Sequence, residues 1–403
     1  MILKETLRVI VKSQREEIIT LNKGVKREEL KEIELDVPFA LILSGIRRCG
    51  KSTLLHQLIE NMKGFYYFNF EDPRAIEFEL ADFQKLNDIF KEIYGEQNYY
   101  FFDEIQNIEN WELFARQMLD KKKHLIITGS NASLLSKELG TKLTGRHLRY
   151  ELFPFSYKEF LTITNEKPSI ESFQKYFTKG GFPEYIKLER ATILQELLND
   201  IITRDIVVRH KLRSTKTIKE MALYLITNVG KEFSYNNLKK TFELGSVNTA
   251  IAFVSYFEDS YLLFTVPKFD YSLKKQIINP KKIYSIDNGL SNITSASFSE
   301  DKGKMLENLA FINLRKKHKD IFYFKEKNEC DFVIKEATKI TKAIQVCYEL
   351  NEDNKKRELN GLSEAIEKFN LNEGTILTYN QEDEITIQNK KIIIMPLWKW
   401  LLE

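Results

Sequence analysis

Short apolar runs and amphipathic stretches alternate over residues 1–130. Continuous apolar runs predict buried strands at residues 39–43, 64–70, 99–102 and 125–128. Apolar side chains at helical spacing predict helices at residues 2–20, 53–60 and 81–95. We therefore expect a parallel sheet with helices in this part of the chain.

The middle of the chain has a different pattern. Residues 190–219 are helical in pattern, and three apolar-periodic stretches follow at residues 217–228, 235–242 and 246–258. Two strands are predicted at residues 261–266 and 276–278, around a loop that carries lysines. Three helices followed by a β-hairpin is the order of a winged helix.

Composition narrows the class of protein. The 403 residues are 43% hydrophobic, which is enough for several cores and predicts two to four domains. A net charge of +3 does not indicate a nucleic-acid binder. Three isolated cysteines argue against a disulfide framework or a zinc site. With no signal-peptide pattern and no long apolar span, we expect a cytoplasmic protein without a membrane partner.

A phosphate-loop pattern follows the first predicted strand. Gly45, Gly50, Lys51 and Ser52 match Gly, four residues, Gly-Lys-Ser/Thr, between a strand and a helix. Backbone N–H groups of such a loop point at phosphate, Lys51 reaches the β- and γ-phosphates, and the Ser52 hydroxyl ligates Mg²⁺. A glycine turn before an ordinary helix is the alternative. The predicted nucleotide-binding residues are Gly45, Ile46, Arg47, Arg48, Cys49, Gly50, Lys51, Ser52 and Thr53.

Two acidic residues end the apolar run at residues 99–102. Asp103 is predicted to accept from the Mg²⁺ water shell, and Glu104 to orient and activate the attacking water. The alternative is that the pair caps the next helix. Asn131 follows the strand at residues 125–128, where it would lie near the γ-phosphate. The alternative is that Ser130 or Asn131 is simply the N-cap of the next helix.

These motifs together resemble an AAA-type ATPase of the AAA+ superfamily. The matching stretches are residues 45–52 for Walker A, 101–104 for Walker B and 128–131 for sensor 1. Residues 144–146, 152–160 and 180–184 look like one prokaryotic family, in which the core precedes a winged helix and a restriction-endonuclease-like domain. The resemblance implies a five-stranded parallel core, ATP with Mg²⁺, and Arg146 as a catalytic finger or sensor, in cis or in trans. A structural ion pair is the alternative for Arg146.

The resemblance also implies the fold class. We expect an α/β protein with a three-layer P-loop NTPase core of AAA+ type, a helical lid, a winged helix and a C-terminal α/β restriction-endonuclease-like domain. The expected boundaries are 1–30 for an N-terminal helix, 31–163 for the core, 164–212 for the lid, 213–290 for the winged helix and 291–403 for the last domain.

The winged helix only partly supports DNA binding. Its expected recognition helix, residues 246–255, contains no Lys or Arg. The positive charge is elsewhere, at Lys239, Lys240, Lys268, Lys274, Lys275, Lys281 and Lys282. We therefore expect duplex contact mainly through phosphates, with weak sequence specificity. A protein-contact module is the alternative.

The last domain departs from the nuclease motif that it resembles. Glu307 and Asp331 are present, but Gln345 stands where the second carboxylate belongs and Cys347 where the lysine belongs. Such a site needs carboxylates for Mg²⁺ and a lysine for the attacking water, so nuclease activity is not expected. A migrated lysine such as Lys342 is the alternative. Otherwise the domain is a scaffold, or a binding surface with Arg315, Lys316, Lys317 and Lys319.

Three functions follow from these residues. The first is a Mg²⁺-dependent ATPase that acts as a conformational switch or motor, with duplex DNA as one candidate partner. The second is an ATP-gated nuclease. The third is a signalling or assembly ATPase that recruits protein partners, and a homo-oligomer stays open for all three.

Overall fold

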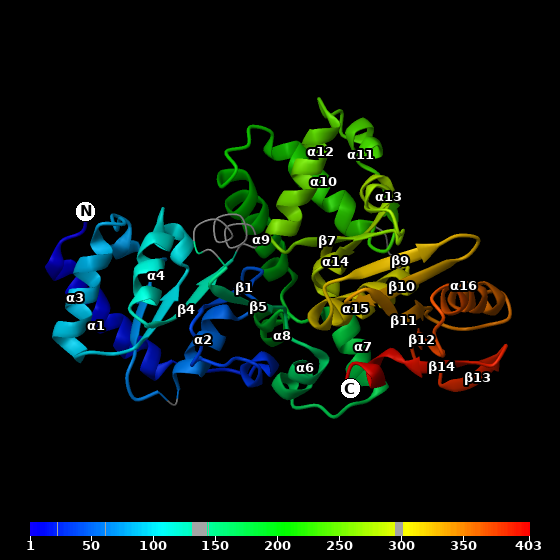
Figure 1. Ribbon diagram of the computed structural model, residues 1–403, viewed down its shortest axis with the longest axis horizontal. Helices are drawn as coiled ribbons and strands as arrows, with labels where there is room; N and C mark the ends of the chain where they lie inside the picture. The colour runs from blue at the N-terminus through cyan, green and yellow to red at the C-terminus, as the bar shows by residue number, and fades with distance from the viewer. Residues whose placement is uncertain (22, 61, 131–142, 144, 295–300) are drawn as a thin grey trace. The chain divides into compact units, whose positions relative to one another are not determined.

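The computed structural model describes residues 1–21, 23–60, 62–130, 143, 145–294 and 301–403. It divides into two compact units, an N-terminal unit of residues 1–152 and a C-terminal unit of residues 153–403 (Figure 1). The expected AAA-type core of residues 31–163 therefore extends beyond the boundary between the units.

A five-stranded sheet forms the centre of the N-terminal unit. Its strands lie in the order β2-β3-β4-β1-β5, and every neighbouring pair is parallel, as expected for the AAA-type core. The strands are β1 (Ala40–Gly45), β2 (Tyr66–Asn69), β3 (Tyr99–Asp103), β4 (His124–Gly129) and β5 (His147–Leu152). Because β1 lies between β4 and β5, its carboxyl end opens at the point where the strand order reverses, which is where such sheets bind ligands.

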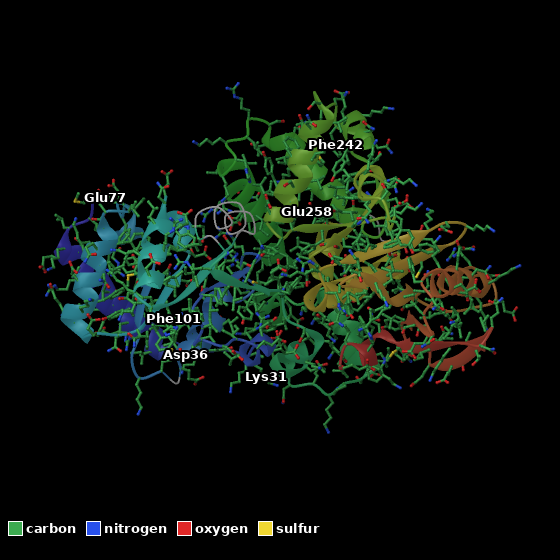
Figure 2. All side chains as sticks on the ribbon, in the orientation of Figure 1. Lys31, Asp36, Glu77, Phe101, Phe242 and Glu258 are labelled. Atoms are coloured by element: carbon green, nitrogen blue, oxygen red, sulfur yellow. The ribbon has the colours of Figure 1, made fainter. Side chains whose placement is uncertain are left out.

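Helices cover both faces of this sheet. Alternate strand residues such as Ile42, Phe68 and Phe102 share one buried cluster with α1, α3 and α4. The opposite face carries Phe101, which is fully buried and labelled in Figure 2, and α2 packs against β1 and β4. The helices are α1 (Lys4–Thr20), α2 (Lys51–Ile59), α3 (Asp82–Tyr94) and α4 (Trp111–Asp120). Helix α1 confirms the helix predicted at residues 2–20, and the sheet with its helices confirms the arrangement expected for this part of the chain.

The C-terminal unit begins with helices. A capping box at Ser156 and Glu159 starts the first of them. These elements are α6 (Tyr157–Thr164), α7 (Ile170–Lys179), α8 (Pro183–Leu188), α9 (Ala191–Asp200), a π-helix (Ile201–Val208) and α10 (Thr215–Thr227). The helical pattern predicted over residues 190–219 is therefore interrupted between Val208 and Thr215.

The Gly180-Gly181 motif has a packing role in this unit. A Cβ on Gly180 would lie 2.2 Å from an oxygen of Asp287, and one on Gly181 would lie 2.3 Å from the Phe155 carbonyl oxygen. The Gly181 N–H donates to the buried Asp287 carboxylate, 2.6 Å away. These glycines let the α7–α8 turn lie directly against the segment that begins α14 (Asn288–Thr294).

Three helices and a small antiparallel sheet follow. The helices are α10, α11 (Tyr235–Thr241) and α12 (Val247–Asp259), and the strands are β6 (Glu232–Phe233), β7 (Leu263–Pro267) and β8 (Lys281–Ser285), in the order β6-β8-β7. Glu258, labelled in Figure 2, accepts hydrogen bonds from the backbone N–H and the hydroxyl of Thr265, at 3.1 and 2.7 Å, and so ties the end of α12 to β7.

The strand predicted at residues 276–278 is wrong. These residues end a short helix, α13 (Leu273–Ile278), and the strand that pairs with β7 begins after Pro280. Ile277 and Ile278 have strand-forming side chains, but both are exposed, so no packing favours a strand there. Pro280 has no N–H for a strand ladder, which is consistent with pairing that starts at Lys281.

A six-stranded mixed sheet completes the C-terminal unit. Its order is β13-β14-β12-β11-β10-β9, with α16 packed on its central strands. The strands are β9 (Ile321–Lys325), β10 (Glu329–Glu336), β11 (Lys339–Val346), β12 (Glu373–Thr378), β13 (Asp383–Ile387) and β14 (Lys390–Pro396). The helices are α15 (Lys302–Lys317), α16 (Lys355–Lys368) and α17 (Leu397–Trp400). Within the described ranges, no helix combines the length and the apolar character needed to cross a membrane.

Candidate functional site

The predicted phosphate loop joins β1 to α2. Gly45 ends β1 with a φ of 153°, and a Cβ there would lie 2.2 Å from the carbonyl oxygen of Leu152 on β5. Gly50, at the N-cap of α2, is left-handed with a φ of 102°. Both positions of the motif therefore need glycine, because one is a close backbone approach and the other is a conformation that disfavours side chains.

The amino-terminal end of α2 is suited to an anion. No side chain in the described part of the protein caps this helix, so its first N–H groups are left for another acceptor. Lys51, at the first helical position, is buried, and its ammonium donates to the carbonyl oxygens of Gly45 and Ile46, each 3.1 Å away. N–H groups, a helix dipole and an ammonium group thus gather at one point.

Asp103 lies at the carboxyl end of β3, beside this loop. Its carboxylate hydrogen-bonds the hydroxyl groups of Ser52 and Thr128. Burial, followed by the charge of Glu104, raises the pKa of Asp103 to about 6. A hydroxyl from the loop and an aspartate at the end of another strand of the same sheet are the two protein groups that hold Mg²⁺ in P-loop NTPases, so this pair fits that ion.

Glu104 immediately follows, in a left-handed conformation with a φ of 53°. Such a backbone costs a non-glycine residue about 1–2 kcal/mol and is often retained where a side chain must be aimed. Its N–H donates to the Thr128 hydroxyl oxygen at 2.9 Å, and its side chain accepts from Gln106. One carboxylate oxygen lies 3.9 Å from the Lys51 ammonium. Thr128 therefore positions Asp103 and Glu104 together.

Ser130 lies just beyond β4, whose neighbours in the sheet are β1 and β3. Its hydroxyl is buried and has no hydrogen-bond partner within the described residues. A buried polar group without a partner is costly unless something satisfies it. In the sequence, Ser130 is part of the stretch 128–131 that resembles sensor 1, and it is one of two candidate caps for the next helix. Asn131, the predicted sensor, lies outside the described residues.

Arg146 is not brought to the loop of its own chain. It precedes β5, its carbonyl oxygen accepts from Ala40 at the start of β1, and its guanidinium is 2.7 Å from Asp120. Since β1 and β5 run in parallel register over six residues, Arg146 and the loop are at opposite ends of β1, about 17 Å apart at 3.3 Å per residue. Arg149 is closer to the loop and donates to the Ser44 hydroxyl at 3.0 Å.

Arg27 is a site residue that sequence reasoning missed. Its buried guanidinium donates to the carbonyl oxygen of Cys49 at 2.6 Å, and its N–H donates to Gln57 of α2 at 3.1 Å. Arg27 therefore connects the loop to α2 and stabilises the loop conformation. No local signal marks it, because this arginine stands 18 residues before the motif and reaches it only through the fold.

The two arginines within the loop, Arg47 and Arg48, have other surroundings than Arg27. Arg47 lies 3.6 Å from Glu71, and Arg48 is left-handed with a φ of 61°. Cys49 is buried, and burial raises the pKa of its thiol. None of these observations indicates that Arg47 or Arg48 binds phosphate.

The four residues compared with the nuclease motif also meet in space. Glu307, Asp331, Gln345 and Cys347 line one hollow of about 770 Å³ in the C-terminal unit. Asp331 donates its N–H to the Gln345 side chain at 3.2 Å, and Gln345 donates to Glu358 at 2.6 Å. Lys342 is exposed at another part of β11 and does not line this hollow.

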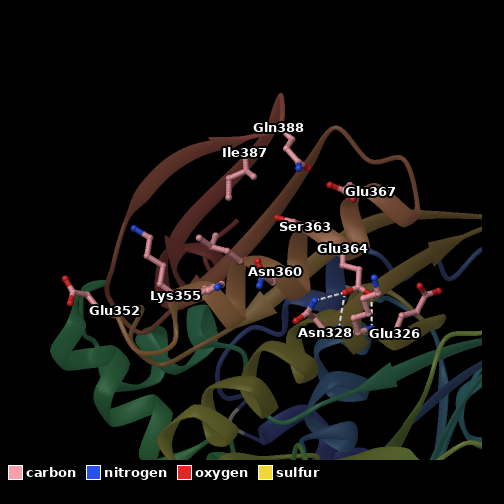
Figure 3. Close-up of a pocket in the computed structure, with 13 residues that line it drawn as sticks. Glu326, Asn328, Glu352, Lys355, Asn360, Ser363, Glu364, Glu367, Ile387 and Gln388 are labelled. Carbon is pink, nitrogen blue, oxygen red and sulfur yellow. Dashed lines mark hydrogen bonds between the residues drawn. The ribbon is translucent and has the colours of Figure 1, made fainter.

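A second hollow, of about 820 Å³, lies along α16 (Figure 3). Glu364 accepts from the N–H groups of Lys327 and Asn328 and from the Asn328 side chain, at 2.8–2.9 Å, as the dashed lines show. These bonds anchor the β9–β10 turn to α16. The carboxylate of Glu364 therefore has a structural role.

Comparison with known families agrees with the N-terminal site. Residues 38–161 match a family described as an AAA domain. Residues 170–301 and 302–400 match two families described as domains of unknown function, DUF8612 and DUF4143. The protein therefore contains an AAA-type P-loop domain, and its all-parallel sheet is that of a P-loop NTPase.

The chain belongs to the same family as MJ1544 of Methanocaldococcus jannaschii, a protein described as uncharacterized. The two are 38% identical over 96% of this chain and 95% of the relative. A Haemophilus influenzae protein, also described as uncharacterized, is 29% identical over 79% of this chain and 84% of its own.

Solved structures show only a distant likeness. A replication initiator DnaA bound to AMPPCP and single-stranded DNA gives a TM-score of 0.31 at 14% identity, over 63% of this chain and 92% of its own. A signal-transduction ATPase of the STAND class from Pyrococcus horikoshii gives 0.26 at 13% identity, over 74% and 47%. These scores are too low to define a common fold for the whole chain.

Proposed function

We propose that the protein binds and hydrolyses ATP with Mg²⁺ at the carboxyl edge of the N-terminal sheet. The observation that carries this proposal is the convergence of Lys51, Ser52, Asp103 and Glu104 around the uncapped end of α2. A match to an AAA domain supports the same conclusion. Binding alone would not need a carboxylate held in a left-handed turn beside the lysine, so Glu104 favours hydrolysis.

Each residue has a distinct part in this proposal. The α2 N–H groups and Lys51 bind the phosphates, with Lys51 exchanging its two carbonyl acceptors for phosphate oxygens. Ser52 and Asp103 hold Mg²⁺, which neutralises charge on the phosphates when bound. Glu104 orients the attacking water, and Ser130, whose buried hydroxyl has no partner among the described residues, donates to the γ-phosphate or that water. Asn131 remains a candidate for the same task.

The test compares two variants that affect different steps. Lys51→Ala removes a phosphate ligand, so we expect ATP affinity to fall at least about tenfold. Glu104→Gln keeps the shape but not the charge, so we expect ATP to bind normally and kcat to fall about a hundredfold or more. Lys12→Ala and Glu109→Gln, at exposed positions of the same unit, are the matched controls. Unchanged turnover in Glu104→Gln would remove the water-activating role.

Arg146 has no part in hydrolysis within one chain under this proposal, because it lies at the far end of β1. A role in trans requires a second copy that presents Arg146 to the site of its neighbour. We therefore connect Arg146 to a homo-oligomer and otherwise assign it the ion pair with Asp120.

A second candidate function is DNA contact by the C-terminal unit. Helices α10 to α12 with the antiparallel sheet β6-β8-β7 have the element order of a winged helix, which favours this role. The lysines support it less fully than expected. Lys282 is buried, and Lys281 donates to the carbonyl oxygens of Gln276 and Ile277 at 3.3 and 2.9 Å. ATP-driven repositioning of this unit, as a switch or motor, would connect the two functions.

A further inference from the structure

A compact cluster of opposite charges lies where the sheet β6-β8-β7 meets α15 and β10. The Lys282 ammonium of β8 is 2.9 Å from Glu307 and 2.8 Å from both Glu329 and Asp331. Lys282 is 1% exposed, and Glu307 and Asp331 are 2% and 4% exposed. Three carboxylates from two elements thus surround a single cation supplied by a third element.

The remaining hydrogen-bonding capacity of the carboxylates is also used. Lys304 is 2.7 Å from the second oxygen of Glu307, and Lys325 is 3.0 Å from the second oxygen of Glu329. The second oxygen of Asp331 accepts from the N–H of Val346 at 3.0 Å. Glu232 is also 2.6 Å from Lys325, so four carboxylates share three ammonium groups, and every carboxylate of the cluster already has a lysine partner.

This arrangement differs from that of the nuclease site implied by resemblance. Such a site holds a divalent ion between its carboxylates. Here Glu307 and Asp331 are present, but the neutral Gln345 is engaged with Glu358 and with the Asp331 backbone. Among the residues with described positions, no group of three or more His, Cys, Asp or Glu side chains could hold a metal ion. While the Lys282 ammonium lies between the carboxylates, the residues therefore do not fit a metal.

We propose that Lys282 is the resident cation of this cluster, that it replaces the divalent metal of a nuclease-like site, and that it ties β8 to α15 and β10. An ammonium group has three donors, which match the three surrounding carboxylates. A divalent ion could enter only by displacing a buried lysine from all of its partners, which would leave the displaced ammonium group buried without a carboxylate. The domain is thus a metal-independent structural unit, whatever the N-terminal site does.

The state of Lys282 agrees with this role. Burial alone would lower the pKa of Lys282, but Asp331 and Glu307 beside it raise that pKa well above its ordinary value. The lysine is therefore charged throughout the neutral range. Tyr284, also on β8, donates to Glu307 at 2.6 Å and makes a second tie between the same elements.

The experiment measures uptake of Mn²⁺ by the full-length protein, from the paramagnetic signal of the free ion. All proteins carry Asp103→Asn and are free of nucleotide, so the N-terminal site does not contribute. We expect no uptake while Lys282 is present. Lys282→Met, which keeps the length and removes the charge, should take up one Mn²⁺ for each chain, and adding Asp331→Asn should abolish that uptake.

Two results would overturn the proposal. One is uptake of Mn²⁺ with Lys282 present that is lost in Asp331→Asn, because the metal would then displace the ammonium. The other is no uptake by a folded Lys282→Met protein, because the carboxylates would then not form a latent cation site.

A second measurement covers the case in which Lys282→Met does not fold. Lys282→Met leaves four carboxylates with two lysines, whereas Lys282→Met with Glu307→Gln removes one of those carboxylates and leaves three with two. We expect the melting temperature to fall in the single variant and to recover in part in the double variant. An unchanged melting temperature in the single variant, or a further fall in the double variant, would contradict the role of Lys282 as the neutralising cation.

Discussion

The fold alone does not explain why the hydroxyl group of Ser130 is buried. Its hydroxyl is buried beside the strands that carry the loop and Asp103, and it has no hydrogen-bond partner in the described parts of the chain. Most buried hydroxyl groups are hydrogen-bonded, so a native group without a partner needs a reason. A γ-phosphate oxygen or the attacking water would supply that partner.

Replacement of Ser130 by alanine tests this reason. Ser130→Ala should lower kcat about tenfold to a hundredfold, because one donor to the transferred group is lost. ATP affinity should change little, since Lys51 and the α2 N–H groups are intact. Stability should be unchanged or slightly increased, because the removed hydroxyl has no hydrogen-bond partner among the residues with described positions. Normal turnover would leave Asn131 as the remaining candidate for this position.

The site residues that sequence reasoning found are those with local signals. Lys51 and Ser52 follow from spacing, and Asp103 and Glu104 follow from an apolar run that ends in acidic residues. Arg27 and Lys282 could not be found in this way, because each acts on partners that are distant in sequence. Lys282 was instead assigned to DNA phosphate, since a lysine in a predicted hairpin gives no indication that three carboxylates will surround it.

At the scale of elements, helix α2 begins at the phosphate loop and also carries the buried imidazole of His56. His56 lies on the face of α2 turned toward β2, where its ring meets that of Tyr67 edge to face at 6.1 Å. Burial lowers the pKa of His56 from 6.5 to about 4. The helix therefore packs with a neutral imidazole at neutral pH.

This packing predicts acid sensitivity. The unfolded chain binds the proton of His56 first as the pH falls, so the stabilisation is complete above pH 6.5 and is lost as the pH falls through 4. The loss should approach about 3 kcal/mol of unfolding free energy. Urea unfolding between pH 4 and 7 measures it, and His56→Phe should show a smaller slope over this range. Equal slopes would mean that other groups control the acid response.

Element types were predictable where periodicity and burial agree, and failed where they conflict. All four predicted strands of the N-terminal sheet formed, because each is buried on both faces. The apolar stretch at residues 276–278 became the end of α13, because its isoleucines face solvent and have no packing partner. The fifth strand, β5, was not located from the sequence, since most of its residues are only partly buried.

For the whole molecule, contact with DNA would depend on the lysines that are exposed and on the net charge. Of the lysines expected to meet phosphate, Lys239, Lys240 and Lys274 lie on helices α11 and α13. Lys275 of α13 is 3.5 Å from Asp270, and Lys282 is buried. Three phosphate contacts would give a slope of log affinity against log salt of about −3. A net charge of +3 adds little general attraction for DNA.

Affinity for duplex DNA measured across salt concentrations tests this estimate. We expect Lys274→Gln to reduce the magnitude of the slope by about 1, with no change in sequence preference. Lys216→Gln, at an exposed residue paired with Glu220, is the control. A flat salt dependence would exclude the phosphate-contact role and favour a protein-contact module.

The close approach of Gly45 to Leu152 has a mechanical consequence. Gly45 is the first residue of the loop that receives phosphate, and Leu152 is the last residue of the N-terminal unit. No side chain separates the two backbones, so a displacement of the loop backbone at Gly45 would also displace the Leu152 carbonyl group. The loop is therefore in direct backbone contact with the residue that ends the N-terminal unit.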